Sequence, residues 1–175
     1  MSFATRALLC SHGMKSDRPN EPPLPEPLGY LLTWRTHGSW LPGDQRGWVR
    51  KAGGNQAPDE QRHRAAARAM NAEEVRLNSQ QRIIAEQAIR DHCQFRNWQL
   101  FAVNCRSNHV HAVVSADLHP KEVLRQLKAW ATRRLNEADS PQDAWWAEKG
   151  SIRYLNSEAA LEGGIVYVRD AQDRK

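Results

Sequence analysis

Residues 98–114 read WQLFAVNCRSNHVHAVV, the pattern of a β-hairpin. Residues 98–103 have the composition of a strand, residues 106–108 form a short polar turn, and residues 109–114 have the composition of a second strand. We therefore expect two antiparallel strands, the second of which carries the sequence His109-Val110-His111.

The segments on either side of this hairpin supply further elements of one sheet. In chain order we expect a strand at 30–34, a helix from Ser79 to Asn97, the hairpin, a helix at about 119–137, a strand at 151–155 and a helix from Ser157 to about Gln172. The core order βαββαβ predicts an α+β fold: a ferredoxin-like antiparallel sheet with helices on one face, followed by a C-terminal helix that carries Tyr167.

Two segments lie outside this pattern. Residues 16–29 hold five prolines in fourteen positions, which is incompatible with a helix or an interior strand. We expect residues 1–28 to form a disordered tail and residues 29–175 to form one domain. Between the first strand and the first core helix, a loop at 44–55 precedes an Ala- and Arg-rich stretch at 58–72, which predicts an exposed, inserted helix.

The composition narrows the class of protein. The 175 residues include 25 Lys and Arg against 20 Asp and Glu, a net charge of +5 that permits a nucleic-acid partner without requiring one. No apolar run approaches the roughly 20 residues that cross a bilayer, so no membrane partner is expected. The three cysteines, Cys10, Cys93 and Cys105, lack the spacing of a disulfide framework or a zinc site, which favours a reducing, cytoplasmic location.

The His-Val-His sequence is the main candidate for chemistry. Side chains alternate along a strand, so His109 and His111 point to one face while Val110 points to the other. The two imidazoles could then bind one metal ion. The alternative is a pair of polar residues on a solvated strand face, which is the commoner meaning of this sequence taken alone.

Three motifs extend over most of the chain. Residues 31–44 read LLTWRTHGSWLPGD, residues 108–111 read NHVH, and residues 146–155 read WAEKGSIRYL, followed by Tyr167-Val168 and Gln172. In this order the motifs resemble those of the single-tyrosine HUH transposases, an insertion-sequence type that includes the REP-associated tyrosine transposases.

The resemblance implies a site-specific enzyme that nicks and rejoins single-stranded or hairpin DNA. Tyr167 would be the catalytic nucleophile and would form a 5′-phosphotyrosine. His109 and His111 would hold a divalent metal, Mg²⁺ or Mn²⁺, which offsets the negative charge that develops on the phosphate. Members of the family often form homodimers, so the resemblance makes a homodimer one possible partner, and the sequence itself does not decide the oligomeric state.

The third metal ligand is open between two residues. Many relatives have Gln or Asn at the fourth position after the tyrosine, where this chain has Ala171. Gln172 is the first candidate by resemblance, although in a regular helix it points away from Tyr167. Asp170 lies nearer to the Tyr167 side of the helix and offers an oxygen that suits Mg²⁺.

Charged residues suggest two DNA contacts. The loop residues Arg46, Trp48, Arg50 and Lys51 combine cations with an aromatic ring, which suits phosphate neutralisation and base stacking. Lys121, Arg125 and Lys128 form a second cationic surface on the helix at 119–137. Either group could instead be an ordinary solvated face.

Two other functions fit the same residues. The chain could be a domesticated DNA- or RNA-binding relative without catalysis, which Ala171 and the Gly163-Gly164 pair in the last helix favour. It could also be a metal-dependent nuclease that uses water in place of a covalent step.

Overall fold

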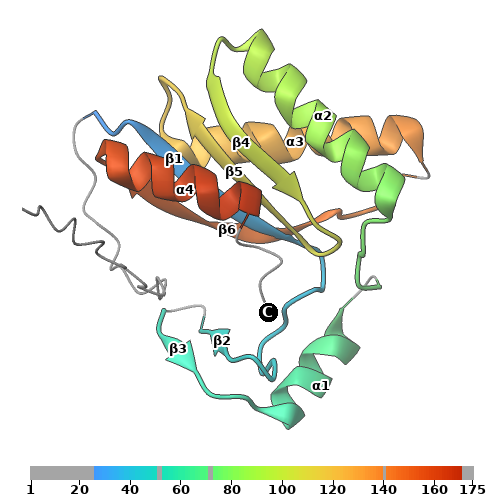
Figure 1. The fold of residues 1–175 in the computed structure, drawn as a ribbon. Helices are drawn as coiled ribbons and strands as arrows, with labels where there is room; N and C mark the ends of the chain where they lie inside the picture. Colours follow the sequence, from blue (N-terminus) through green and yellow to red (C-terminus); the bar gives the residue numbers. More distant parts are fainter. Residues whose placement is uncertain (1–25, 51–52, 71–72, 140, 171–175) are drawn as a thin grey trace, which may run out of the picture.

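A computed structural model describes residues 26–50, 53–70, 73–139 and 141–170. Its centre is a four-stranded antiparallel sheet with the strand order β4-β5-β1-β6 (Figure 1). The strands are β1 (Gly29–Thr36), β4 (Gln99–Cys105), β5 (His109–Ser115) and β6 (Trp146–Leu155). Together with the helices between them they give the βαββαβ order, so the predicted α+β class is confirmed.

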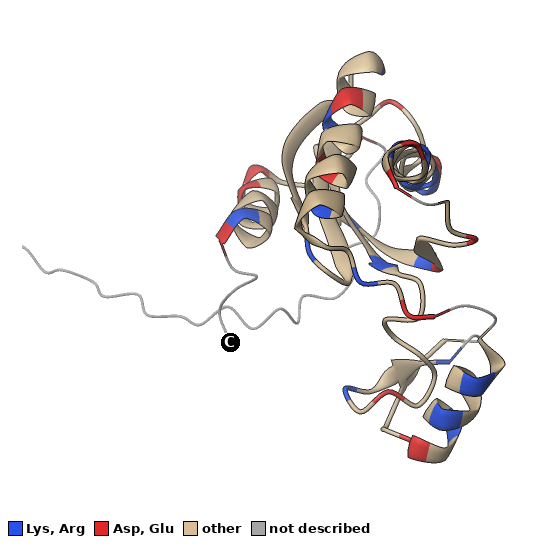
Figure 2. Ribbon diagram, turned by 90° about the vertical axis from the view of Figure 1, so that its right-hand side faces the viewer, with Lys and Arg blue, Asp and Glu red and all other residues tan. Residues whose placement is uncertain are grey.

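Helices cover both faces of this sheet. The helices α2 (Ser79–Phe95) and α3 (Pro120–Ala138) pack on one face, and α4 (Glu158–Asp170) packs on the other, so α3 and α4 appear on opposite sides in Figure 2. The larger apolar core lies under α2 and α3 and includes the fully buried Trp34, Val110 and Leu127. The smaller core lies under α4 and includes Val113, Leu155 and Val168.

Local signals explain where the core helices begin. The side chain of Asn78 accepts a hydrogen bond from the Gln81 amide at 2.8 Å, and the Gln81 side chain accepts one from the Asn78 amide at 2.9 Å. This reciprocal pair is the capping box that the sequence predicts at the start of α2. Pro120 occupies the first turn of α3, where its missing N–H costs nothing.

An insert stands between β1 and α2. It holds a two-stranded ribbon, β2 (Trp48–Val49) with β3 (Asn55–Gln56), and the helix α1 (Glu60–Ala69), and it projects beyond one end of the sheet (Figures 1 and 2). None of the residues of α1 is buried, as expected for an exposed inserted helix. The chain leaves the sheet and returns to it at one place, because the Val75 amide donates to the carbonyl of His37 at 2.9 Å.

Three boundaries differ from the sequence-based expectation or cannot be compared with it. The ribbon β2-β3 replaces the structureless loop expected at 44–55, and β6 begins at Trp146 instead of residue 151 because β1 continues to pair with it across a register shift. The tail expected at 1–28 lies outside the described residues except for its last three, of which Leu28 donates its amide to the carbonyl of Leu155.

Candidate active site on the α4 face of the sheet

The strand β5 separates polar from apolar side chains as its alternation predicts. Val110 and Ala112 are fully buried under α2 and α3. His109 and His111 lie on the opposite face, with ring centroids 4.9 Å apart, and His111 keeps only 7% of its surface exposed. The two imidazoles are therefore neighbours on the face that α4 covers.

Each imidazole is held through its Nδ1 atom. His109 Nδ1 lies 2.7 Å from the side-chain oxygen of Asn108, and because that oxygen can only accept, the proton sits on Nδ1. His111 Nδ1 lies 2.7 Å from the hydroxyl of Thr33 on β1. Histidines that ligate metals are commonly oriented by such a bond at one nitrogen, which directs the lone pair of Nε2 toward the ion. The histidine pair thus fits a divalent metal.

The protonation state of His111 also suits a ligand. Burial, together with the positive charges of His109, Arg35 and Arg106, lowers the pKa of His111 to about 4. The ring is therefore neutral at physiological pH, and a metal ion would not have to displace a proton from it.

Tyr167 on α4 lies next to this pair. Its ring centroid is 5.3 Å from that of His111 in an edge-to-face arrangement, and the side chain is 38% exposed. Gly164, one turn earlier, lets α4 approach the sheet, because a Cβ there would lie 3.3 Å from a methyl group of Leu155. The helix α4 continues through Gly163 and Gly164 from Glu158 to Asp170, and the Tyr167 phenol stands beside an imidazole with access to solvent.

The third ligand stays a prediction. Gln172 lies outside the described residues. Within residues 26–50, 53–70, 73–139 and 141–170, no three His, Cys, Asp or Glu side chains come close enough to hold a metal ion. Asp170 is exposed, and the structure does not bring it together with the histidine pair.

The strand β1 contributes polar groups that the sequence-based reasoning did not select. Thr33 is paired with His111, and Arg35 is paired with His109. The guanidinium of Arg35 is half-buried and lies within electrostatic reach of Tyr167. The two-residue spacing of Leu31, Thr33 and Arg35 predicts that they share one face of β1. Only the pairing of β1 with β5 places that face at the site.

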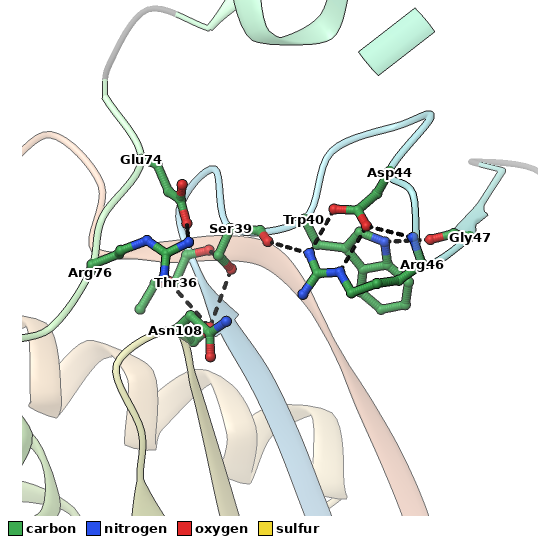
Figure 3. Close-up of polar contacts among 9 residues, drawn as sticks. All are labelled: Thr36, Ser39, Trp40, Asp44, Arg46, Gly47, Glu74, Arg76 and Asn108. Carbon is green, nitrogen blue, oxygen red and sulfur yellow. Dashed lines mark hydrogen bonds and ion pairs between the residues drawn. The ribbon is translucent and has the colours of Figure 1, made fainter. Parts of the chain in front are cut away.

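The loop cations predicted to contact DNA are partly engaged inside the insert. Arg46 donates to both carboxylate oxygens of Asp44, at 2.8 and 2.6 Å, and to the carbonyl of Ser39 at 3.0 Å (Figure 3). The hydrogen bonds from Arg46 to the Asp44 carboxylate hold the pKa of Asp44 at about 2. Arg50 is exposed and bonds to Gln56, and Lys51 lies outside the described residues.

Trp48 is packed within the insert. Only 8% of its surface is exposed, its Nε1 donates to the carbonyl of Ala57 at 3.0 Å, and the guanidinium of Arg62 covers its ring at 5.0 Å. A base could not stack on this ring without displacing those contacts, so its burial does not favour the predicted DNA contact.

The second cationic group lies on the other side of the sheet from the histidines. Lys121, Arg125 and Lys128 all belong to α3, which packs on the face opposite α4. Arg125 forms two bonds to Glu122, and Lys128 donates its ammonium to the carbonyls of Ala147 and Glu148 at 2.6 and 3.0 Å. These three cations therefore lie on the face of the sheet away from the histidine pair, because α3 packs against the Val110 side of β5.

A comparison with protein-family models finds one match. The family model described as "Transposase IS200 like" matches residues 67–151, just under half of the chain. The matched segment contains the histidine pair but neither β1 nor Tyr167. The resemblance read from the motifs is thus confirmed at the level of this family, and the match supports a transposase function with DNA as the substrate.

Other comparisons add little. A solved structure described as "a putative transposase from Deinococcus radiodurans R1" has a TM-score of 0.42 and 16% identity, over 90% of this chain and 97% of that one. At that likeness the fold assignment rests on the strand order of this chain itself. No curated protein matches the chain. Among the described residues, every helix is too short or too polar to cross a membrane.

Proposed function

Starting from the similarity to IS200-like transposases, we propose that this protein cuts and rejoins single-stranded DNA through a covalent bond between Tyr167 and a 5′ phosphate. The observation that carries the proposal is the contact between Tyr167 and His111, two residues that are 56 positions apart in sequence. A nucleophile and a metal-binding pair are two parts that such a reaction needs at one place.

The chemistry is a balanced exchange of phosphodiester bonds. The Tyr167 oxygen, after losing its proton, attacks the phosphorus, and the bond to the 3′ oxygen of the preceding nucleotide breaks. The products are a 5′-phosphotyrosine and a free 3′ hydroxyl. Because the phosphate bond is kept, a 3′ hydroxyl can later attack the phosphotyrosine and release Tyr167, so the strand is rejoined without an energy source.

Other residues of the chain support this step. His109 and His111 would hold a divalent ion, whose chemistry is to polarise the phosphate and offset its charge. Thr33 and Asn108 orient the two rings. The guanidinium of Arg35 adds positive charge on the same face of the sheet, where negative charge develops in the transition state.

The experiment is a covalent-adduct assay. A labelled single-stranded oligonucleotide that contains a hairpin is incubated with the protein and Mn²⁺, and the product is resolved under denaturing conditions. We expect a protein–DNA adduct that is lost in Tyr167→Phe and in the presence of a chelator. Tyr154→Phe is the matched control, because Tyr154 packs edge-to-face on Tyr30 under the other helices and should leave the adduct intact.

The alternatives give different outcomes. Cleavage that survives in Tyr167→Phe without any adduct would indicate a metal-dependent nuclease that uses water. Binding without cleavage or adduct in the unmodified protein would indicate a binding protein that has lost catalysis.

A further inference from the structure

A second aromatic residue of the insert lies beside the candidate site. Trp40 follows β1 by four residues, and its indole is 39% exposed, whereas Trp34, Trp48, Trp98, Trp145 and Trp146 are buried. The guanidinium of Arg35 lies 4.2 Å from the centroid of its ring. Since Arg35 is paired with His109, the exposed indole stands at the edge of the histidine face.

The position of Trp40 is fixed by hydrogen bonds. Its Nε1 donates to the carbonyl of Gly47 at 2.6 Å, and the preceding residue, Ser39, donates its hydroxyl to the carbonyl of Thr36 at 2.9 Å (Figure 3). The carbonyl of Ser39 also accepts a hydrogen bond from the Arg46 guanidinium. An exposed aromatic ring that is already ordered loses little conformational freedom when a ligand stacks on it.

Among the described residues, Arg35 has no acidic partner of its own. Its neighbour Asp44 is engaged by Arg46, and in the part of the chain that the structure describes no carboxylate forms an ion pair with Arg35. A guanidinium in that position is suited to a phosphate.

We propose that Arg35 and Trp40 together bind the nucleotide next to the reacting phosphate, with Arg35 on a phosphate oxygen and Trp40 stacked on the base. The placement next to the reacting phosphate rests on the proposed function of the histidine–Tyr167 site. The occupant is single-stranded DNA, because a base in a duplex has its faces covered by its neighbours and cannot stack on a side chain unless it is unstacked. Stacking of this kind tolerates any base, so Trp40 contributes affinity and position rather than sequence preference.

The test separates binding from cleavage. All proteins carry Tyr167→Phe and are studied without divalent metal, so that binding is measured whether or not the protein cuts DNA. A series of fluorescent single-stranded oligonucleotides, each with one abasic position, is titrated by anisotropy against this protein, against a variant that adds Trp40→Ala and against one that adds Val49→Ala. Val49 is the matched control, because it is an exposed apolar residue of the same insert.

We expect one abasic position at which binding weakens about fivefold or more, and we expect that penalty to vanish in the Trp40→Ala variant and to persist in the Val49→Ala variant. Adding Arg35→Gln should reduce the slope of log affinity against log salt by about 0.7, the value for one phosphate contact on a single strand, whereas Arg35→Lys should retain the slope. Circular dichroism checks that each variant is folded.

Two results would overturn the proposal. One is an abasic penalty that is unchanged by Trp40→Ala, and the other is a salt slope unchanged by Arg35→Gln. In protein that retains Tyr167, the abasic-sensitive nucleotide should adjoin the bond that Mn²⁺-supported cleavage breaks, and a sensitive nucleotide elsewhere would contradict the placement. A protein that shows the Trp40-dependent penalty but forms no adduct would retain the binding site and would refute only the covalent mechanism.

Discussion

The two sides of β5 differ in what they do for the molecule. Val110 and Ala112 point under α2 and α3 and are completely buried, and they belong to the larger core. His109 and His111 point under α4, where the contacts are polar and Tyr167 keeps access to solvent. One strand therefore supplies stability with one set of side chains and candidate chemistry with the other, so the two roles can be disturbed separately.

The largest expected effect concerns the histidine side. His111→Ala should reduce Mn²⁺-supported adduct formation by at least about 100-fold, because it removes half of the metal-binding pair. The free energy of unfolding should fall by about 1 kcal/mol, because the hydrogen bond to the Thr33 hydroxyl is lost. Adduct yield and urea unfolding of the same preparation measure both. A variant that unfolds but keeps its activity per folded molecule would break the comparison.

The valine side should respond in the opposite way. Val110→Ala removes two buried methyl groups and leaves a cavity, so we expect the free energy of unfolding to fall by about 2 kcal/mol. The adduct yield per folded molecule should be unchanged, because the removed methyl groups do not face the histidines. Urea unfolding measures the first quantity. Loss of the adduct in a Val110→Ala protein that is fully folded would show that the valine side and the histidine side of β5 are coupled.

A smaller effect is expected on the local stability of the insert, and this effect depends on pH. Its Asp44 has a pKa of about 2, below the ordinary value, because Arg46 donates to the carboxylate. The folded protein therefore binds fewer protons here than the unfolded chain, and the stabilisation is complete near neutral pH and is lost as the pH falls through about 2. Asp44→Asn should lower the protection of the Gly47 amide against hydrogen exchange about tenfold at pH 7.

The pH dependence of the Asp44→Asn effect provides an internal control. Between about pH 5 and pH 2 the difference between Asp44→Asn and the unmodified protein should shrink steadily, since protonation removes the same charge from Asp44. Amides in β5, measured in the same samples, should show no difference. A difference that is constant with pH would mean that shape, rather than charge, explains the effect.

The smallest effect is expected on α3. Replacement of both Lys121 and Arg125 by Ala should weaken binding of a single-stranded oligonucleotide by less than about twofold, because both side chains are exposed to screening solvent and α3 lies on the far side of the sheet from Tyr167. Fluorescence anisotropy at moderate salt measures this. A loss as large as that expected from Arg35→Gln would show that DNA reaches around to the α3 side.

Local sequence patterns predicted the helices and strands of the sheet domain, and they predicted which side chains of β5 share a face. Alternation placed His109 and His111 on one face, and the capping residues located the start of α2. The approach of Tyr167 to His111 was expected only through the resemblance to a family, because no local pattern relates two residues that are so far apart in the chain.

Tertiary packing decided what the local patterns could not. Arg35 lies at the site because β1 pairs with β5, and the sequence of neither strand alone determines this pairing. Trp40 and Trp48 lie in the same segment, and each has a guanidinium against its ring and an Nε1 atom that donates to a carbonyl. Only the packing of the insert makes Trp48 8% exposed and Trp40 39% exposed. The cations of α3 share a helical face, but the spacing did not say which side of the sheet that helix would occupy.

The hydrogen bond between Val75 and His37 has a consequence for how this protein could diversify. A segment whose two ends meet at one point can be lengthened, shortened or exchanged in evolution without moving the strands beneath it. The reacting residues would then stay constant, while the insert changes from one descendant to another. Such an arrangement would let a lineage acquire new target sites and keep a single chemistry.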